Sequence, residues 1–140
     1  MANELIKKYE GLRLQAYKCS AGVWTIGYGT TVYPGGKRVQ KGDTCTEAQA
    51  ERYLEHYLET EVNVNLDKDF PNLKTHQREA LQSLLYNWSW YSFRKSLLYT
   101  AIKKNNIGQI YKQWDIIHVN GEASLGLIRR RLEELQLWFK

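Results

Sequence analysis

The spacing of apolar residues changes twice along this chain. Near the N-terminus apolar residues recur every three to four positions, which predicts a short amphipathic helix over about residues 3–11. Gly11 is a typical helix stop, so this helix carries Glu10 in its last turn. The apolar positions of the helix are Leu5, Ile6, Tyr9 and Leu12.

Over about residues 14–45 the pattern becomes that of short strands and turns. The Pro-Gly-Gly at residues 34–36 predicts a hairpin turn. Residues 23–29 alternate in character and predict a strand. One of its faces carries a hydroxyl and two glycines, which lets a ligand approach the backbone closely, so the glycines are predicted to bind substrate. The apolar face comprises Trp24, Ile26 and Tyr28, and the opposite face comprises Thr25, Gly27 and Gly29.

Helical spacing returns at Thr46, which forms a capping-box pattern with Gln49 and begins a helix that reaches about Val62. Phe-Pro-Asn at residues 70–72 ends this stretch, and Thr75 is predicted to cap the next helix. That helix has the most apolar stripe in the chain, which predicts a central core helix. Its stripe comprises Ala80, Leu81, Leu84, Leu85 and Trp88, and further helices are predicted around residues 93–103, 107–117 and 124–139.

These elements predict a single α+β domain over residues 1–140. A small sheet lobe covers about residues 13–45, and a larger helical lobe covers about residues 46–140 together with the N-terminal helix. A chain of 140 residues buries enough surface to fold without disulfides or a metal. The cleft between the lobes is the expected site.

The net charge of +5 favours an anionic partner, which includes nucleic acid, an anionic membrane surface and a bacterial cell wall. In the most basic run, Arg129 and Arg130 stand four positions before Glu133 and Glu134. This spacing predicts that the basic run, which ends at Arg131, belongs to a salt-bridged helix face rather than a phosphate-binding patch. No DNA or RNA motif accompanies it, so nucleic acid is not expected as a partner.

The remaining composition excludes several classes of site. No apolar run approaches the roughly 18 residues of a membrane span, and the N-terminus lacks the apolar core of a signal peptide, so synthesis in the cytoplasm without stable membrane insertion is expected. His56, His76 and His118 are widely spread and no CxxC pair is present, so neither a metal site nor a cofactor is predicted. A disulfide between Cys19 and Cys45 outside the cytoplasm is an alternative that the sequence leaves open.

Three chemical groups gather in the stretch from the first helix to the predicted strand. Eight residues separate Glu10 from Cys19, and five separate Cys19 from Thr25. A carboxylic acid opposite small polar groups, across a cleft with aromatic walls, fits glycoside hydrolysis. The second carboxylate usual in that chemistry is missing.

This stretch, EGLRLQAY…GVWTIGYGT, closely resembles the phage-type lysozymes, the endolysins of tailed bacteriophages. The segments TEAQAERYL, REALQSLLYN and GLIRRRLEE extend the resemblance over nearly the whole chain. It implies a lysozyme-like fold and hydrolysis of the β-1,4 bond between N-acetylmuramic acid and N-acetylglucosamine in peptidoglycan, with inversion in the better-studied members. Glu10 matches the family's general acid, Thr25 the threonine that helps hold the attacking water, and Asn87 a substrate-contacting amide.

Cys19 departs from the family pattern, because many members have aspartate there. A thiol with a pKa of about 8.5 is mostly neutral at pH 7, whereas an aspartate of about 3.9 is charged. Three outcomes stay open: Cys19 acts as a thiolate or polarised thiol, the enzyme is weak, or catalysis is lost. The last corresponds to the alternative function, a silent peptidoglycan-binding scaffold on the lysozyme fold.

The resemblance also implies a cellular setting. An endolysin without a leader accumulates in the host cytoplasm, is released by a holin and then acts on the cell-wall peptidoglycan. A monomer is expected on the same grounds, and one of the three consecutive arginines at residues 129–131 is expected to approach the Glu10 helix.

Overall fold

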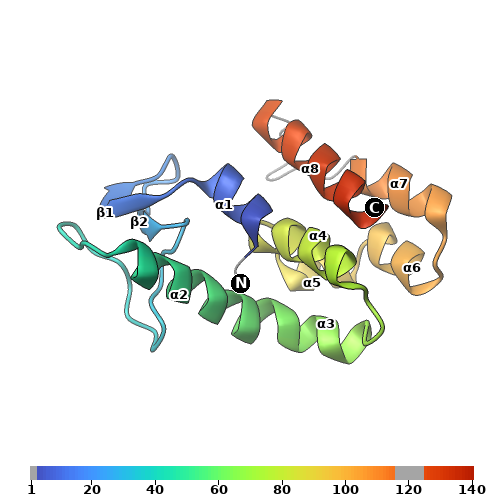
Figure 1. The fold of residues 1–140 in the computed structure, drawn as a ribbon, viewed down its shortest axis with the longest axis horizontal. Helices are drawn as coiled ribbons and strands as arrows, with labels where there is room; N and C mark the ends of the chain where they lie inside the picture. Colours follow the sequence, from blue (N-terminus) through green and yellow to red (C-terminus); the bar gives the residue numbers. More distant parts are fainter. Residues whose placement is uncertain (1–2, 116–124) are drawn as a thin grey trace. The chain divides into compact units, whose positions relative to one another are not determined.

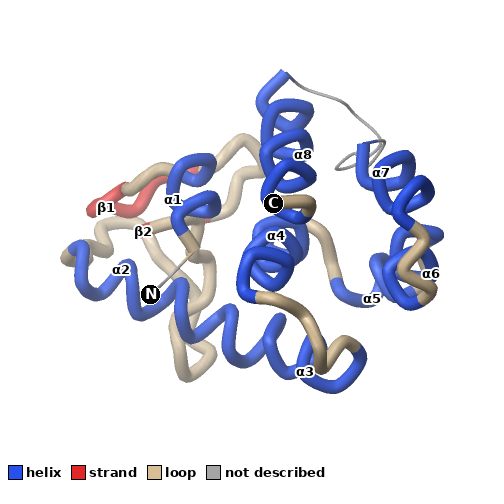
Figure 2. The backbone as a smooth tube through the Cα atoms, turned by 45° about the vertical axis from the view of Figure 1, so that its right-hand side comes forward, coloured by secondary structure: helices blue, strands red, loops and turns tan. Residues whose placement is uncertain are grey.

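The computed structural model describes residues 3–115 and 125–140, and the chain divides into two compact units, Met1–Glu61 and Val62–Lys140 (Figure 1). The first unit contains α1 (Glu4–Glu10), β1 (Arg13–Lys18), β2 (Trp24–Gly27), α2 (Glu47–Tyr57) and the start of a π-helix, η1 (Leu58–Asn63). The second contains α3 (Val64–Asp69), α4 (Thr75–Tyr86), α5 (Trp90–Arg94), α6 (Leu97–Lys103), α7 (Ile107–Asp115) and α8 (Leu125–Trp138). A small sheet with many helices confirms the predicted α+β class (Figure 2).

Helix α1 begins and ends where the sequence predicts. The Asn3 side chain accepts hydrogen bonds from the backbone N–H groups of Leu5 and Ile6, at 3.0 and 3.1 Å, and so caps the N-terminus. Gly11 follows the helix at φ 71°, a left-handed conformation that glycine adopts without strain. Glu10 is therefore the last residue of α1.

The two strands form an antiparallel hairpin in which Tyr17 faces Thr25 and Lys18 faces Trp24. The register shifts between Arg13 and Tyr17. On its other edge β1 hydrogen-bonds to residues 43–45, through Ala16 N–H to the Asp43 carbonyl and Cys45 N–H to the Leu14 carbonyl, both at 2.9 Å. The predicted turn at residues 34–36 is confirmed by the bridge between Val32 and Arg38.

The predicted strand over residues 23–29 is too long. Ile26 and Tyr28 are buried as the alternation requires, but the strand ends at Gly27, because Gly27 and Gly29 have φ values of 64° and 81°. A Cβ added to Gly27 would lie 3.1 Å from the Ala50 Cβ of α2. Glycine at this position therefore lets α2 pack directly on the sheet.

The capping box of α2 is confirmed. The Gln49 N–H donates to the Thr46 hydroxyl at 3.1 Å, and the Gln49 amide oxygen accepts from the Thr46 N–H at 2.9 Å. The helix departs from the prediction after Tyr57, where six residues adopt π geometry before α3. The Thr60 hydroxyl donates to the His56 carbonyl at 2.8 Å, and such a bond competes with the backbone ladder of the helix.

In the second unit α4 is the core helix, as predicted, with six consecutive buried residues from Ala80 to Leu85 and close packing on α8. Thr75 is not its cap. Lys74 is the N-cap residue, and the Gln77 amide oxygen accepts from the Lys74 N–H at 3.0 Å. The helix also ends before Trp88.

The helix predicted over residues 93–103 is two helices, α5 and α6. Ser96 separates them because its hydroxyl accepts from the Tyr99 N–H at 3.2 Å and caps α6. The predictions for residues 107–117 and 124–139 correspond to α7 and α8. Residues 116, 117 and 124 and His118 lie outside the described residues.

Candidate functional site

Cys19 lies at the turn of the hairpin, directly after β1. Its N–H donates to the Val23 carbonyl at 3.0 Å, and its carbonyl accepts from the Gly22 N–H at 2.8 Å. Gly22 has φ 78°, the left-handed position that a three-residue hairpin loop requires. These local backbone bonds therefore fix the position of Cys19 in the loop.

The hairpin brings Thr25 to the same face as Cys19. Cys19 opposes Val23 and Tyr17 opposes Thr25, and residues two apart on a strand share a face. Thr25 is only 4% exposed, and its hydroxyl donates to the Val23 carbonyl at 2.9 Å. The structure thus brings together two of the three predicted catalytic residues.

The loop also changes the acidity of the thiol. Backbone hydrogen bonds from Val23 and then Ala21 lower the pKa of Cys19, and a hydrogen bond with the Thr25 side chain adds to them. The Thr25 hydroxyl has one proton, so donating it to sulfur replaces its bond to the Val23 carbonyl. Cys19 is half-buried and has the environment of a thiol that ionises more readily than a free cysteine.

Cys45 has the opposite environment. It is 8% exposed, and burial raises the pKa of its thiol. Its sulfur lies 3.9 Å from the Arg13 carbonyl oxygen. Both cysteines are free thiols, so the structure does not contain the disulfide left open by the sequence.

Glu10 precedes this hairpin by only Gly11 and Leu12 before β1 begins. Its side chain is half-buried at the C-terminal end of α1. Of the predicted substrate-binding glycines, Gly27 faces Ala50 of α2, and Gly29 is half-buried in the turn after the strand. Their contact with substrate stays a prediction.

Asn87, the predicted substrate-binding amide, is the C-cap residue of α4. Its side-chain oxygen accepts a hydrogen bond from Arg131 Nη2 of α8 at 2.8 Å. Arg131 is 2% exposed, and burial lowers its pKa to about 10, an effect that Glu134 partly opposes. The orientation of Asn87 is therefore set by a buried arginine.

Arg131 belongs to a buried polar cluster that joins α4, α7 and α8. The Glu134 carboxylate, 0% exposed, accepts from the Ser83 hydroxyl at 2.5 Å and from the Trp114 indole N–H at 3.2 Å. It also lies 3.0 Å from Arg131 Nε and 3.4 Å from Arg130 Nε. Burial raises the pKa of Glu134, while Arg131, Ser83, Arg130 and Trp114 act to lower it.

This cluster contains part of the salt-bridged face predicted for the last helix. The pair Arg130–Glu134 is present, but both residues are buried. The apolar pattern of α8 indicates this burial, because Leu135 and Trp138 recur at helical spacing on the same face as Glu134 and are buried too. The predicted pairing is therefore confirmed for Arg130 and Glu134, and the structure adds that this pair is buried.

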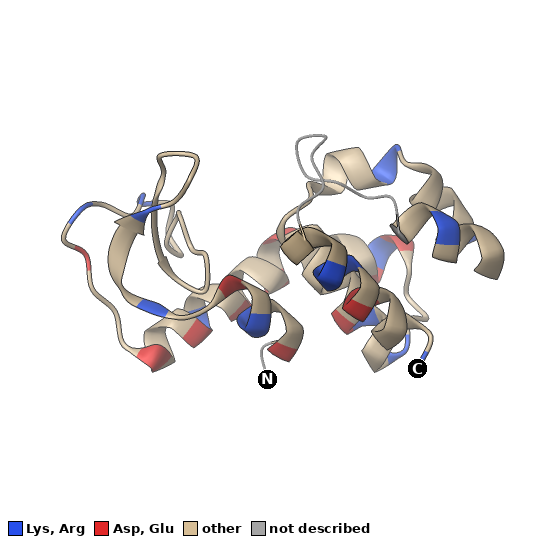
Figure 3. Ribbon diagram, turned by 90° about the horizontal axis from the view of Figure 1, so that it is seen from above, with Lys and Arg blue, Asp and Glu red and all other residues tan. Residues whose placement is uncertain are grey.

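The charge distribution of the described residues is mixed. Figure 3 shows acidic and basic positions interspersed along the helices. Among the described residues no helix combines the length and the apolar character needed to cross a bilayer.

Comparisons with known proteins agree with one another. The family described as phage lysozyme matches residues 7–134. An endolysin of Acyrthosiphon pisum secondary endosymbiont phage 1 is 38% identical, over 96% of this chain and 92% of its own length. A SAR-endolysin of Enterobacteria phage P21 is 35% identical, over 92% of this chain and 78% of its own.

The fold is also similar to solved structures. The endolysin from Escherichia coli O157:H7 phage FAHEc1 superimposes with a TM-score of 0.81 at 34% identity. The superposition covers 96% of this chain and 88% of that protein. The predicted lysozyme-like fold is therefore confirmed.

Proposed function

The chain belongs to the phage lysozyme family and is a peptidoglycan-degrading muramidase, and from this we propose that it hydrolyses the β-1,4 bond between N-acetylmuramic acid and N-acetylglucosamine to cause host cell lysis. The observation that carries this proposal is the pairing of Cys19 with Thr25 on one face of the hairpin that follows Glu10. Each of the three residues has a separate role.

Glu10 is the general acid. Its carboxyl proton passes to the glycosidic oxygen as the bond from that oxygen to the anomeric carbon breaks. Thr25 holds a water molecule whose oxygen forms the new bond to the anomeric carbon. The proton lost by this water goes to the Cys19 thiolate, which replaces the carboxylate base of inverting glycosidases. The lowered pKa of Cys19 supports this role, because only the thiolate can accept the proton.

The test follows the turbidity of chloroform-treated Gram-negative cells or of purified sacculi. Glu10→Gln removes the acid with little change in shape, and we expect the rate of clearing to fall by about 10²- to 10⁴-fold. Cys19→Asp retains activity in this proposal, whereas Cys19→Ala loses most of it. Reduction and mass analysis of the released sugars identify the cleaved bond, because muramidase products carry N-acetylmuramic acid at the new reducing end.

Other outcomes would decide against the proposal. Clearing that persists in Glu10→Gln at an unchanged rate would remove Glu10 as the acid. Binding to sacculi without clearing by the native chain would support the silent scaffold instead. An inactive Cys19→Asp variant with an intact fold would mean that the thiol has a role that a carboxylate cannot fill.

We further propose that the protein acts as a monomer and reaches the cell wall through a holin-dependent lesion. Its relatives include proteins named SAR-endolysin as well as endolysin, so the release route needs its own experiment. Expression with and without a holin separates the routes: lysis only when the holin is present supports the proposal. Sedimentation of the purified chain checks the monomer.

A further inference from the structure

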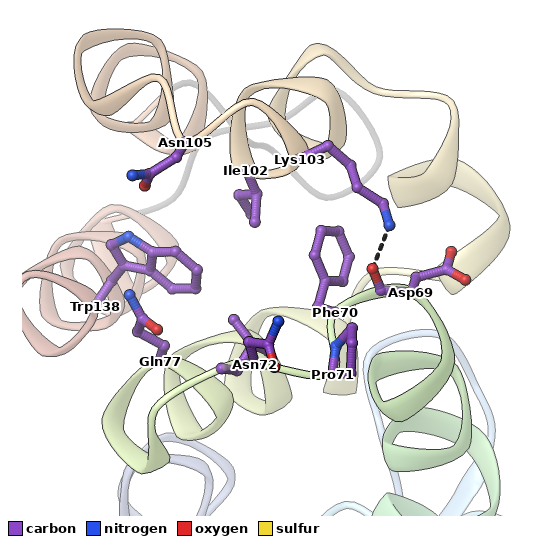
Figure 4. Close-up of a pocket in the computed structure, with 10 residues that line it drawn as sticks. Asp69, Phe70, Pro71, Asn72, Gln77, Ile102, Lys103, Asn105 and Trp138 are labelled. Atoms are coloured by element: carbon purple, nitrogen blue, oxygen red, sulfur yellow. Dashed lines mark hydrogen bonds between the residues drawn. The ribbon is translucent and has the colours of Figure 1, made fainter.

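A cavity of about 510 Å³ opens in the second unit, where α3, α6 and α8 end and α4 begins. Its volume falls within the roughly 300–1,000 Å³ of small-ligand pockets. It contains none of the residues that the proposed reaction uses. Figure 4 shows side chains from these separate elements converging around it.

The inner wall of the cavity is apolar. Phe70, Ile102 and Trp138 are 7%, 8% and 5% exposed, so each is packed in the core and leaves only a small part of its surface to the cavity. Trp138 is held from behind by the Trp114 ring, with the ring centroids 5.5 Å apart. A rigid wall with two aromatic rings suits the apolar face of a sugar ring.

Neutral polar groups without an internal partner surround this wall. Among the described residues, the side-chain amides of Asn72 and Asn105 and the indole N–H of Trp138 make no hydrogen bond. Gln77 uses its amide oxygen for the Lys74 N–H at 3.0 Å, which leaves its amide nitrogen to donate elsewhere. In Figure 4 Asn105, Trp138 and Gln77 lie around the same space. Both donors and acceptors are therefore available to one ligand.

The charged groups of the lining are already engaged. Lys103 donates to the Asp69 carbonyl oxygen and lies 4.8 Å from the centroid of the Phe70 ring. The Asp69 carboxylate accepts from the Tyr99 hydroxyl at 2.7 Å. A neutral ligand therefore fits the cavity better than a phosphate, which needs an uncommitted cation.

We infer that this cavity binds an N-acetylated sugar unit of the peptidoglycan glycan, at a place separate from the residues that cleave it. The apolar side of the sugar ring packs against the exposed parts of this wall, and the acetamido and hydroxyl groups pair with Asn72, Asn105 and Trp138. This inference rests on the proposed function, because peptidoglycan is the source of the sugar. The site gives the enzyme a second hold on its polymeric substrate.

The test is an NMR titration of the full chain, carrying Glu10→Gln, with N-acetylglucosamine and, separately, with glucose. We expect saturable shifts of the Trp138 indole signal and the Asn72 and Asn105 amide signals with the N-acetylated sugar, and weaker binding of glucose. Asn105→Gly preserves the left-handed backbone at φ 51° while removing the amide, so it tests the contact without strain. Its affinity should fall about threefold to tenfold, the loss of one neutral hydrogen bond.

Trp138→Phe keeps an aromatic ring in the wall but removes the N–H together with the rest of the five-membered ring, so it should weaken binding by at least the same factor. Gln136→Ala, an exposed amide on the same helix but outside the lining, should bind like the parent chain. Shifts confined to the hairpin signals of Val23 and Thr25, or equal affinity for glucose, would overturn the inference. The result is independent of the cleavage assay, since loss of clearing in Glu10→Gln is measured on sacculi and not in this titration.

Discussion

The hairpin around Cys19 and the cluster around Glu134 both hold polar side chains, but they do so by different means. In the hairpin, the backbone of a five-residue turn supplies the partners: Val23 and Ala21 hydrogen-bond to Cys19, and Thr25 donates to Val23. In the cluster, side chains from three helices supply them, and the Ser83 and Trp114 donors reach Glu134 from segments distant in sequence.

This difference means that changes in the hairpin should alter mainly the reactivity of Cys19, whereas changes in the cluster should alter mainly the stability of the fold. The Cys19 thiol is half-buried and ionisable, so a change there alters reactivity while most of the fold is retained. The Glu134 carboxylate is fully buried between two arginines, so removing it leaves buried charge without compensation. Three experiments test this contrast.

The largest expected effect is that of Glu134→Ala. It removes the acceptor of Ser83 and Trp114 and the counter-charge of Arg131, and we expect the free energy of unfolding to fall by about 3–5 kcal/mol. Urea unfolding followed by circular dichroism measures the change. Arg129→Ala, an exposed position on the same helix, should stay within about 0.5 kcal/mol of the parent. Equal losses in the two variants would show that the cluster does not contribute as a unit.

The second test is a pair of glycine substitutions in the hairpin. Gly27→Ala forces a left-handed alanine whose Cβ lies 3.1 Å from that of Ala50, and strain with crowding should cost about 2–4 kcal/mol. Gly22 also has a left-handed φ of 78°, but a Cβ added there would have no atom within 4 Å. In Gly22→Ala, backbone strain alone should therefore cost about 1 kcal/mol. The same unfolding measurement compares them. A larger loss for Gly22→Ala would mean that packing against α2 is not what Gly27 provides.

The smallest expected effect is on the thiol. Thr25→Val removes a hydrogen bond that lowers the pKa of Cys19, so at pH 7 the alkylation of Cys19 by iodoacetamide should slow by about twofold to fivefold. The pH at which the alkylation rate reaches half its maximum should rise with it. Thr25→Ser retains the hydroxyl and should behave like the parent.

Cys45 in the same chain is the internal reference for this experiment. Its pKa is raised by burial, so it should react more slowly than Cys19 at pH 7 and should need a higher pH. If the two cysteines were alkylated at the same rate, the hairpin would not be activating Cys19.

Patterns of residues close in sequence were enough to predict the helices and turns around the proposed active site. The stop at Gly11, the capping box of Thr46 with Gln49 and the turn at residues 34–36 each depend on residues close in sequence, and each is present. The same is true of Glu10 at the end of α1. The spacing from Glu10 through Cys19 to Thr25 was also enough to indicate the family to which the chain belongs.

Tertiary packing decided what local pattern could not. Gly27 continued an alternating strand in sequence, but its left-handed backbone and the contact with Ala50 end the strand there. Glu134 formed a favourable helical pair with Arg130 in sequence, but only the packing of α4, α7 and α8 buries that pair and directs Arg131 to Asn87. Caps and tight turns are held by hydrogen bonds between residues close in sequence and can be predicted from a short window, whereas burial depends on which distant segments meet.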